Sequence, residues 1–163
     1  MRWRATVVRG SPVSLTSMAE QTESSIDIDA SASTIMAVIA DLPAYPQWSD
    51  GITEVTVLEE QGGRPLRARF HLESGPIRDT YELLYSWEGD SRVSWQLTSG
   101  DMLRGMDGTY QLEEHGSSTT VHYRLAVDVK IPMIGMIKRK AEKVIVDTAL
   151  KGLRRRVAEI SQG

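Results

Sequence analysis

The residues of this chain best suited to chemistry or ligand contact are tyrosines and tryptophans on the apolar faces of alternating segments. They are Tyr81, Tyr85, Trp87, Trp95, Tyr110 and Tyr123. The whole chain has five tyrosines and four tryptophans but a single phenylalanine. A dry core offers few partners for buried hydroxyl and indole N–H groups, whereas a wet or ligand-filled cavity supplies them. The pattern therefore favours a cavity, with an ordinary aromatic core as the alternative.

Asp79 is the one carboxylate that strand alternation places on an inward face. Burial at a cavity mouth would suit it to proton transfer. The simpler interpretation, which we prefer, is a frayed strand start at which Asp79 meets solvent or Arg104. Arg104 either anchors an anionic head group or decorates a strand end. No catalytic residue is assigned from the sequence, and the candidates are Asp79, Arg104 and Tyr110.

Several other kinds of active site are excluded or disfavoured. The chain has no cysteine, which excludes disulfides, thiolate metal sites and cysteine nucleophiles. Its three histidines, His71, His115 and His122, fall on outward strand faces or in a turn, where a lone histidine is usually solvated. There is no glycine-rich phosphate loop after a strand and no G-x-S-x-G nucleophile elbow. We expect no metal and no cofactor.

Six alternating segments that would position these side chains follow one another between Ile52 and Val129. In the clearest of them, Leu66–Glu73, apolar and charged residues alternate strictly, as in a half-buried strand. Turns that contain glycine, such as Gly62-Gly63, separate the segments. With a further strand expected at Ser24–Asp29, the sheet would have about seven strands.

Two short helical segments are expected between the first strand and the second. Thr34–Ala40 carries a short apolar face, and Ser31 or Ser33 can cap its N-terminus. The two prolines of Leu42–Trp48 end this helix, so that segment is either a second, one-turn helix or a compact loop.

A long amphipathic helix is predicted from about Pro132 to Ile160. Its apolar stripe comprises Ile134, Ile137, Ala141, Val144, Ile145, Thr148, Ala149, Gly152, Leu153, Val157 and Ile160. Its other face is basic, and the acidic residues Glu142, Asp147 and Glu159 that interrupt it indicate that this face is solvated. Transient contact of the basic face with an anionic membrane surface is the alternative. Together the elements predict an α+β fold in which a curved antiparallel sheet wraps around the helix.

The length and charge of the chain set further bounds. With 163 residues it is expected to form one domain over residues 21–163, preceded by a disordered tail over residues 1–20. The net charge of -3 implies no general affinity for nucleic acid. No stretch approaches about 18 consecutive apolar residues, so we expect no transmembrane segment and a cytoplasmic location. The oligomeric state is left open.

The order of elements, ending in a long helix, resembles the helix-grip or START-like fold. Within that SRPBCC superfamily, the chain is similar to the polyketide cyclase/dehydrase and lipid-transport family. The matching residues are Leu42-Pro43-Ala44-Tyr45-Pro46-Gln47-Trp48, Tyr81, Trp87, Trp95, Asp107-Gly108-Thr109-Tyr110 and Gly152-Leu153. The resemblance extends over about Ser24–Ile160 and implies a deep apolar cavity between the sheet and the long helix.

The resemblance also implies that this cavity binds a hydrophobic small molecule, either lipid-like or polyketide-like. The expected ligand contacts are Trp48, Phe70, Tyr81, Leu83, Tyr85, Trp95, Met106, Tyr110, Tyr123, Ile137, Ala141 and Ile145. Trp48 lies in a loop that flanks the cavity entrance in the family, where it is either a lid residue or a hydrophobic plug. Four methionines are expected at a second entrance, where they either adapt to the ligand or simply fill gaps. These are Met102, Met106, Met133 and Met136.

Three classes of function remain open. The first is a carrier that encloses the hydrophobic molecule. The second is a polyketide aromatase/cyclase or dehydrase, in which tyrosine, tryptophan and arginine side chains fold a poly-β-keto chain and stabilise an enolate. The third is an interaction module with a closed core that regulates a partner enzyme. The volume of the cavity separates the third class from the first two.

Overall fold

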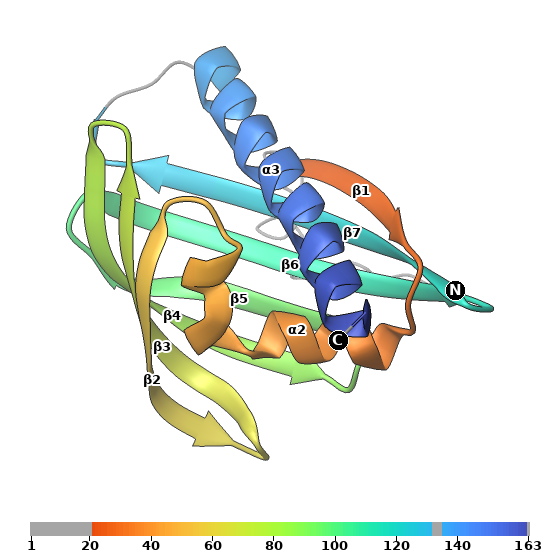
Figure 1. Ribbon diagram of the computed structural model, residues 1–163. Helices are drawn as coiled ribbons and strands as arrows, with labels where there is room; N and C mark the ends of the chain where they lie inside the picture. The colour runs from red at the N-terminus through yellow and green to blue at the C-terminus, as the bar shows by residue number, and fades with distance from the viewer. Residues whose placement is uncertain (1–20, 132–134, 163) are drawn as a thin grey trace, which may run out of the picture.

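The computed structural model describes residues 21–131 and 135–162 (Figure 1). Within them the chain forms one seven-stranded antiparallel sheet, two α-helices and a short 3-10 helix. The tail predicted over residues 1–20 lies outside the described residues, as do Pro132, Met133 and Ile134 before the long helix.

The strands run in the order β1-β7-β6-β5-β4-β3-β2. Strands β2 to β7 therefore pair with their neighbours in sequence, and β1 pairs with β7 as the edge strand on that side of the sheet. Their bounds are β1 Thr22–Ile28, β2 Ile52–Gln61, β3 Arg64–Ser74, β4 Ile77–Glu88, β5 Arg92–Gly100, β6 Leu103–His115 and β7 Ser118–Val129. The predicted α+β class and the helix-grip arrangement are confirmed. Because side chains alternate along each strand, one face of the sheet can line an interior while the other meets solvent.

Short helices connect β1 to β2 as the sequence indicates. In α2 (Ala32–Ala40), the side chain of the N-cap residue Ser31 accepts a hydrogen bond from the backbone N–H of Thr34 at 3.2 Å. The 3-10 helix η2 (Leu42–Gln47) follows at once, and Pro43 stands in its first turn. Ile35, Met36 and Ile39 of α2 are fully buried, which makes this helix part of the core.

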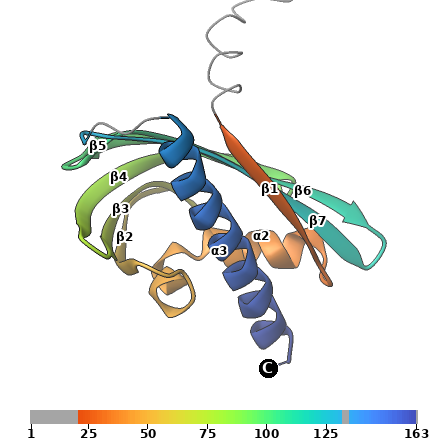
Figure 2. The ribbon, with the colours of Figure 1, turned by 90° about the horizontal axis from the view of Figure 1, so that it is seen from above.

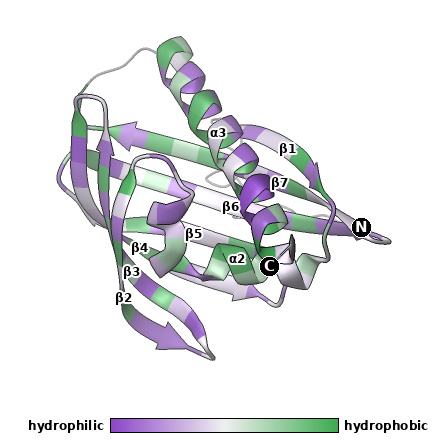
Figure 3. Ribbon diagram, viewed as in Figure 1, coloured by the Kyte–Doolittle hydropathy of each residue, from purple (hydrophilic) through white to green (hydrophobic). Residues whose placement is uncertain are grey.

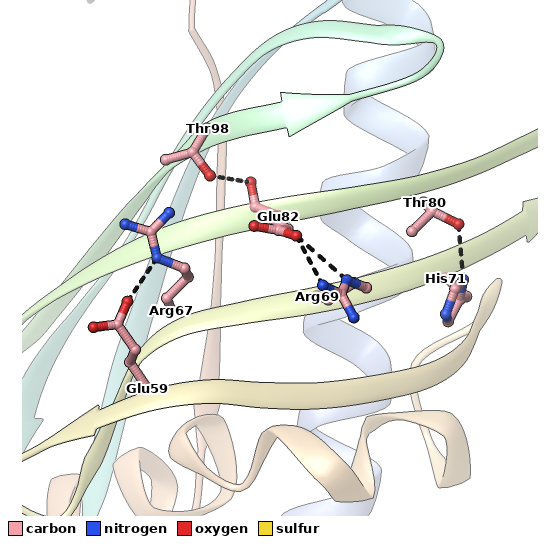
Figure 4. A network of polar contacts seen from close by, with 7 residues as sticks. All are labelled: Glu59, Arg67, Arg69, His71, Thr80, Glu82 and Thr98. Atoms are coloured by element: carbon pink, nitrogen blue, oxygen red, sulfur yellow. Dashed lines mark hydrogen bonds and ion pairs between the residues drawn. The ribbon is translucent and has the colours of Figure 1, made fainter.

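The outer face of the sheet carries a polar ladder across β2, β3 and β4 (Figure 4). Arg67 Nε donates to a carboxylate oxygen of Glu59 at 2.9 Å, and Arg69 Nη2 donates to Glu82 at 3.2 Å. These pairs are partly exposed and contribute about 0–1 kcal/mol each. Their main consequence is to keep this face hydrophilic, which leaves the concave face as the one that can bury apolar groups.

The long helix α3 (Gly135–Gln162) crosses the concave face of the sheet, as the two ribbon views show (Figures 1 and 2). It packs against β1, β7 and α2, at one side of the sheet. Of the predicted apolar stripe, Leu153 and Val157 are buried, whereas Val144 is 60% exposed and Ile145 47% exposed. The buried apolar side chains in this part of the helix are instead Val146 and Leu150.

The predicted stripe was therefore wrong over residues 144–150, because it omitted Val146 and Leu150 and included exposed residues beside them. The helix packs against β1 and β7, and the apolar residues beside this contact, Ala141, Val144 and Ile145, line a cavity instead of packing against protein. The hydropathy colouring shows apolar segments along the whole helix, although only part of it is packed (Figure 3).

Glu142 corrects the prediction that the acidic residues of α3 lie on a solvated face. Its side chain is nearly inaccessible, at 1% exposure for the residue. One carboxylate oxygen accepts from the hydroxyl of Thr22 at 2.7 Å and the other from the backbone N–H of Val127 at 2.7 Å. The pairing of β1 with β7 reaches only Thr22 and Leu125, so Glu142 satisfies an N–H of β7 that β1 no longer covers. The sequence alone could not reveal the burial of Glu142, because that burial depends on β1 beginning at Thr22.

The C-terminal half of α3 is held closely against the end of η2. A Cβ atom at Gly152 would lie 3.0 Å from the backbone oxygen of Trp48 and 3.5 Å from its ring. Glycine at this position therefore permits a close approach of the helix to Trp48. This contact holds α3 against Trp48 on the η2 side of the interior that the helix covers.

Candidate ligand-binding cavity

A cavity of about 730 Å³ lies between the concave face of the sheet and α3. Its wall consists mainly of aromatic and aliphatic side chains from β3, β4, β6 and β7, and of residues on the near side of α3. This volume is within the range of about 300–1,000 Å³ that is usual for small-molecule sites. The cavity exists because α3 packs over β1 and β7 while the rest of the sheet curves away beneath it.

Eleven of the twelve residues predicted to contact a ligand line this cavity. They are Trp48, Phe70, Tyr81, Leu83, Tyr85, Trp95, Met106, Tyr110, Tyr123, Ala141 and Ile145. The twelfth, Ile137, is 54% exposed and lies outside the lining. It precedes Ala141 by one helical turn, and Lys138, the next residue along α3, is part of the lining.

Several lining residues were missing from the prediction, although the sequence held signals for some of them. Leu125 and Val127 share the inward face of β7 with Tyr123, so strict alternation would have included them. Val144 and Thr148 follow Ala141 at helical spacing. Glu142 carries no such signal, because its place in the wall depends on its bonds to β1 and β7.

The inner wall contains two groups of aromatic rings in contact. Tyr110 and Tyr123 are direct neighbours across β6 and β7, with ring centroids 4.5 Å apart. Trp95 adjoins both, with centroid distances of 5.4 and 5.8 Å, and Tyr85 adjoins Trp95 at 6.0 Å. Farther along, Phe70 stacks on Tyr81 with centroids 5.3 Å apart. Flat rings in contact give the wall a rigid shape.

The tyrosines of this wall stay protonated at neutral pH. Burial raises the pKa of Tyr81 and Tyr123, because the phenolate ion would lose its hydration. Burial likewise raises the pKa of Tyr85 and Tyr110, and neighbouring tyrosines raise it further. Their O–H groups are therefore hydrogen-bond donors and poor general bases.

The rim of the cavity is exposed and carries both aliphatic and charged residues. Ile131 is 56% exposed, Val144 60% and Ile77 36%, and all three line the cavity. The charged residues in the lining include Arg104, Asp128 and Lys138. The described part of the wall thus changes from enclosed aromatic rings inside to exposed aliphatic groups at the rim.

The residues expected at the two entrances lie in different environments. Trp48 is buried at 6% exposure and lines the cavity with its edge against Tyr45. Met102 and Met106 also line the cavity, whereas Met136 is 76% exposed on the first turn of α3. Met133 falls outside the described residues.

Asp79 is occupied by the backbone of the β5–β6 turn. Its carboxylate accepts N–H bonds from Asp101, Met102 and Leu103 at 2.8, 3.1 and 2.8 Å. The residue is buried at 6% exposure, so the preferred expectation that it meets solvent or Arg104 was wrong. Asp79 is absent from the cavity lining. Its contacts give it a structural role in holding the turn.

The other candidates for chemistry are placed as follows. Tyr110 and Arg104 both line the cavity, and Arg104 donates weakly to the backbone oxygen of Val129 at 3.4 Å. His71 and His122 lie on the outer face, where they contact Thr80 and Glu113. Over residues 21–131 and 135–162, no group of three or more acidic or histidine side chains is arranged to hold a metal ion.

The fold and cavity define a helix-grip protein with a largely apolar cavity between sheet and helix. The family described as polyketide cyclase/dehydrase and lipid transport matches residues 28–154, and the chain belongs to this family. A search of curated proteins found no significant match.

Solved structures share the fold over nearly their whole length. A START superfamily protein from Mycobacterium smegmatis is 25% identical, with a TM-score of 0.81 over 86% of this chain and 98% of that one. A protein from Thermus thermophilus is 21% identical, with a TM-score of 0.73 over 86% and 99%. The Zhui aromatase/cyclase from Streptomyces sp. R1128 is 14% identical, with a TM-score of 0.71 over 85% and 93%. None of the described helices is long and apolar enough to cross a membrane.

Proposed function

We propose that this protein binds a hydrophobic small molecule, lipid-like or polyketide-like, in the cavity between the sheet and α3. The observation that carries the proposal is a cavity of about 730 Å³ with a mainly aromatic and aliphatic wall. An empty space of this size costs dispersion contacts along its whole lining, and an apolar occupant restores them. A closed-core interaction module does not fit a fold that maintains such a space.

A polyketide cyclase or dehydrase is the second candidate. It is favoured by Tyr110 and Arg104, which line the same cavity and are suited to stabilise an enolate oxygen. Against it, the carboxylate of Asp79 is already occupied by three backbone N–H groups. The raised pKa of the wall tyrosines also makes them poor bases at neutral pH. We therefore rank binding before catalysis.

Native mass spectrometry of the purified protein tests the proposal. We expect a fraction of the protein to carry one small molecule per chain, which is released when the protein is denatured. An apolar fluorescent probe added to ligand-free protein should then bind with a stoichiometry of about one per chain. Failure to find either a co-purified molecule or a bound probe would contradict the proposal. Turnover of a poly-β-keto substrate, lost in Tyr110→Phe and Arg104→Ala, would move the cyclase to first place.

A further inference from the structure

Four tyrosine hydroxyl groups of the inner wall have no partner among the described residues. Tyr45 is the exception among the tyrosines, since its hydroxyl donates to the backbone oxygen of Ile39 at 2.6 Å. The other four are Tyr81, Tyr85, Tyr110 and Tyr123, which all line the cavity. Among the described residues, the side-chain polar atom that is fully enclosed and also lacks a partner is Nε1 of Trp48. The four tyrosine oxygens lack a partner too, so they are not fully enclosed and keep some accessible surface. Because all four residues line the cavity, that surface faces the cavity.

Two of these hydroxyl groups come from directly paired residues. Tyr110 and Tyr123 stand opposite each other in the β6–β7 register, with ring centroids 4.5 Å apart. Both rings are nearly enclosed, at 5% and 6% exposure. When a ligand displaces water from the cavity, these unpartnered donors are costly unless the ligand accepts hydrogen bonds from them.

The distribution of charge limits what that occupant can be. The charged residues of the lining, which include Arg104 and Lys138, are partly or fully exposed, apart from Glu142. Glu142 is itself negative, and its two oxygens are bonded to Thr22 and Val127. A buried anion beside the tyrosines would therefore have no enclosed cation from the described lining to compensate its lost hydration.

We propose, on the basis of the proposed binding function, that the inner wall recognises an uncharged oxygen acceptor of the ligand through the hydroxyl groups of Tyr110 and Tyr123. The acceptor is a carbonyl, ether or hydroxyl oxygen. The apolar part of the ligand extends toward the rim, where Val144 and Ile131 line the cavity. The ligand thus lies with its polar group inside and its apolar part outward. Tyr81 and Tyr85 offer further donors to a ligand with more than one oxygen.

Tetralin and tetralone form a matched pair of probes for this inference, because they differ by one methylene replaced with a carbonyl. A purely apolar cavity prefers tetralin, since tetralone must give up hydrogen bonds to water. In calorimetric titrations of the native protein, we expect tetralone to bind at least as tightly as tetralin. In Tyr110→Phe/Tyr123→Phe, tetralone affinity should fall about tenfold while that of tetralin stays the same.

Tyr45→Phe is the control, because it removes a hydroxyl group that already has a protein partner. It should leave the ratio of the two affinities unchanged. If the double variant does not fold, Tyr110→Phe and Tyr123→Phe alone should each lower the ratio. A native preference for tetralin that these substitutions do not alter would overturn this inference but leave the binding function intact. Naphthoate offers a charged carboxylate in place of a ketone, and tighter binding of naphthoate than of tetralone would overturn the inference that the acceptor is uncharged. Binding of none of the probes would overturn the binding function itself.

Discussion

The indole ring of Trp95 lies directly over Gly108, its partner on the neighbouring strand. The two residues are paired in the β5–β6 register, and a Cβ atom at position 108 would overlap Cε2 and Cζ2 of the indole. Only glycine leaves room for the ring to lie against the sheet. Because Trp95 lies flat, the space above it remains open as part of the cavity. The pair thus determines the depth of the cavity at this point.

Gly108→Ala is predicted to push Trp95 away from the sheet and into the cavity. We expect a loss of about 1–3 kcal/mol in the free energy of unfolding, as for other overpacked sites, and weaker binding of an apolar probe. Urea denaturation and probe titration measure the two effects. Gly105→Ala, on the same strand, is the control, because its Cβ would lie 3.6 Å from the nearest atom, the Cβ of Asp128. Equal effects of the two substitutions would show that the ring does not depend on Gly108.

Asp79→Asn is predicted to destabilise the β5–β6 turn without affecting probe binding. An amide offers one oxygen where the carboxylate now accepts three N–H groups, and its own NH2 would face those donors. The expected loss is about 1–3 kcal/mol in the free energy of unfolding. Asp101→Asn, an exposed position in the same turn, should stay within about 0.5 kcal/mol. A stable Asp79→Asn variant that lost turnover of a poly-β-keto substrate would instead give Asp79 a catalytic role.

Two substitutions on α3 separate packing against the core from lining of the cavity. Leu153 is fully buried, so Leu153→Ala should cost about 2–5 kcal/mol of stability. Ile145 lines the cavity and is 47% exposed, so Ile145→Ala should cost less than about 1 kcal/mol yet lower probe affinity. Thermal or urea unfolding together with probe titration measures both. If Ile145→Ala proved as destabilising as Leu153→Ala, the helix would be packed differently.

The order of elements and the cavity-facing aromatic residues could be predicted because strand alternation is a local property of the sequence. Tyr81, Trp95 and Tyr110 follow from period-two patterns alone. The packing of α3 could not be obtained in this way, because an apolar helical face has the same pattern whether it meets side chains or an open cavity.

Buried polar residues were the other limit of the sequence. The positions of Glu142 and Asp79 depend on backbone N–H groups of distant segments, such as that of Val127. The sequence does not indicate which N–H groups the strands leave unpaired, so Glu142 was expected to meet solvent and Asp79 to meet solvent or Arg104.

We propose a test of the alternative interpretation of the basic face, transient contact with anionic membranes, at the start of α3. Met136 is 76% exposed and Ile137 54% exposed, and three basic residues, Lys138, Arg139 and Lys140, follow them directly. We expect the protein to sediment with vesicles of anionic lipid more than with neutral vesicles, and less so at high salt. Met136→Ser/Ile137→Ser should weaken this binding. Equal partition onto both kinds of vesicle, or onto neither, would contradict the prediction.

Blocking the cavity from α3 tests the central claim of an enclosed hydrophobic ligand most directly. Ala141 and Ala158 are both exposed on α3, but Ala141 lines the cavity and Ala158 lies outside the lining. The measurement is the affinity of an apolar fluorescent probe for the native protein, Ala141→Trp and Ala158→Trp. We predict one probe per chain in the native protein and in Ala158→Trp, and at least a tenfold loss of affinity in Ala141→Trp. Unchanged affinity in a folded Ala141→Trp variant, or no binding to the native protein, would contradict the claim.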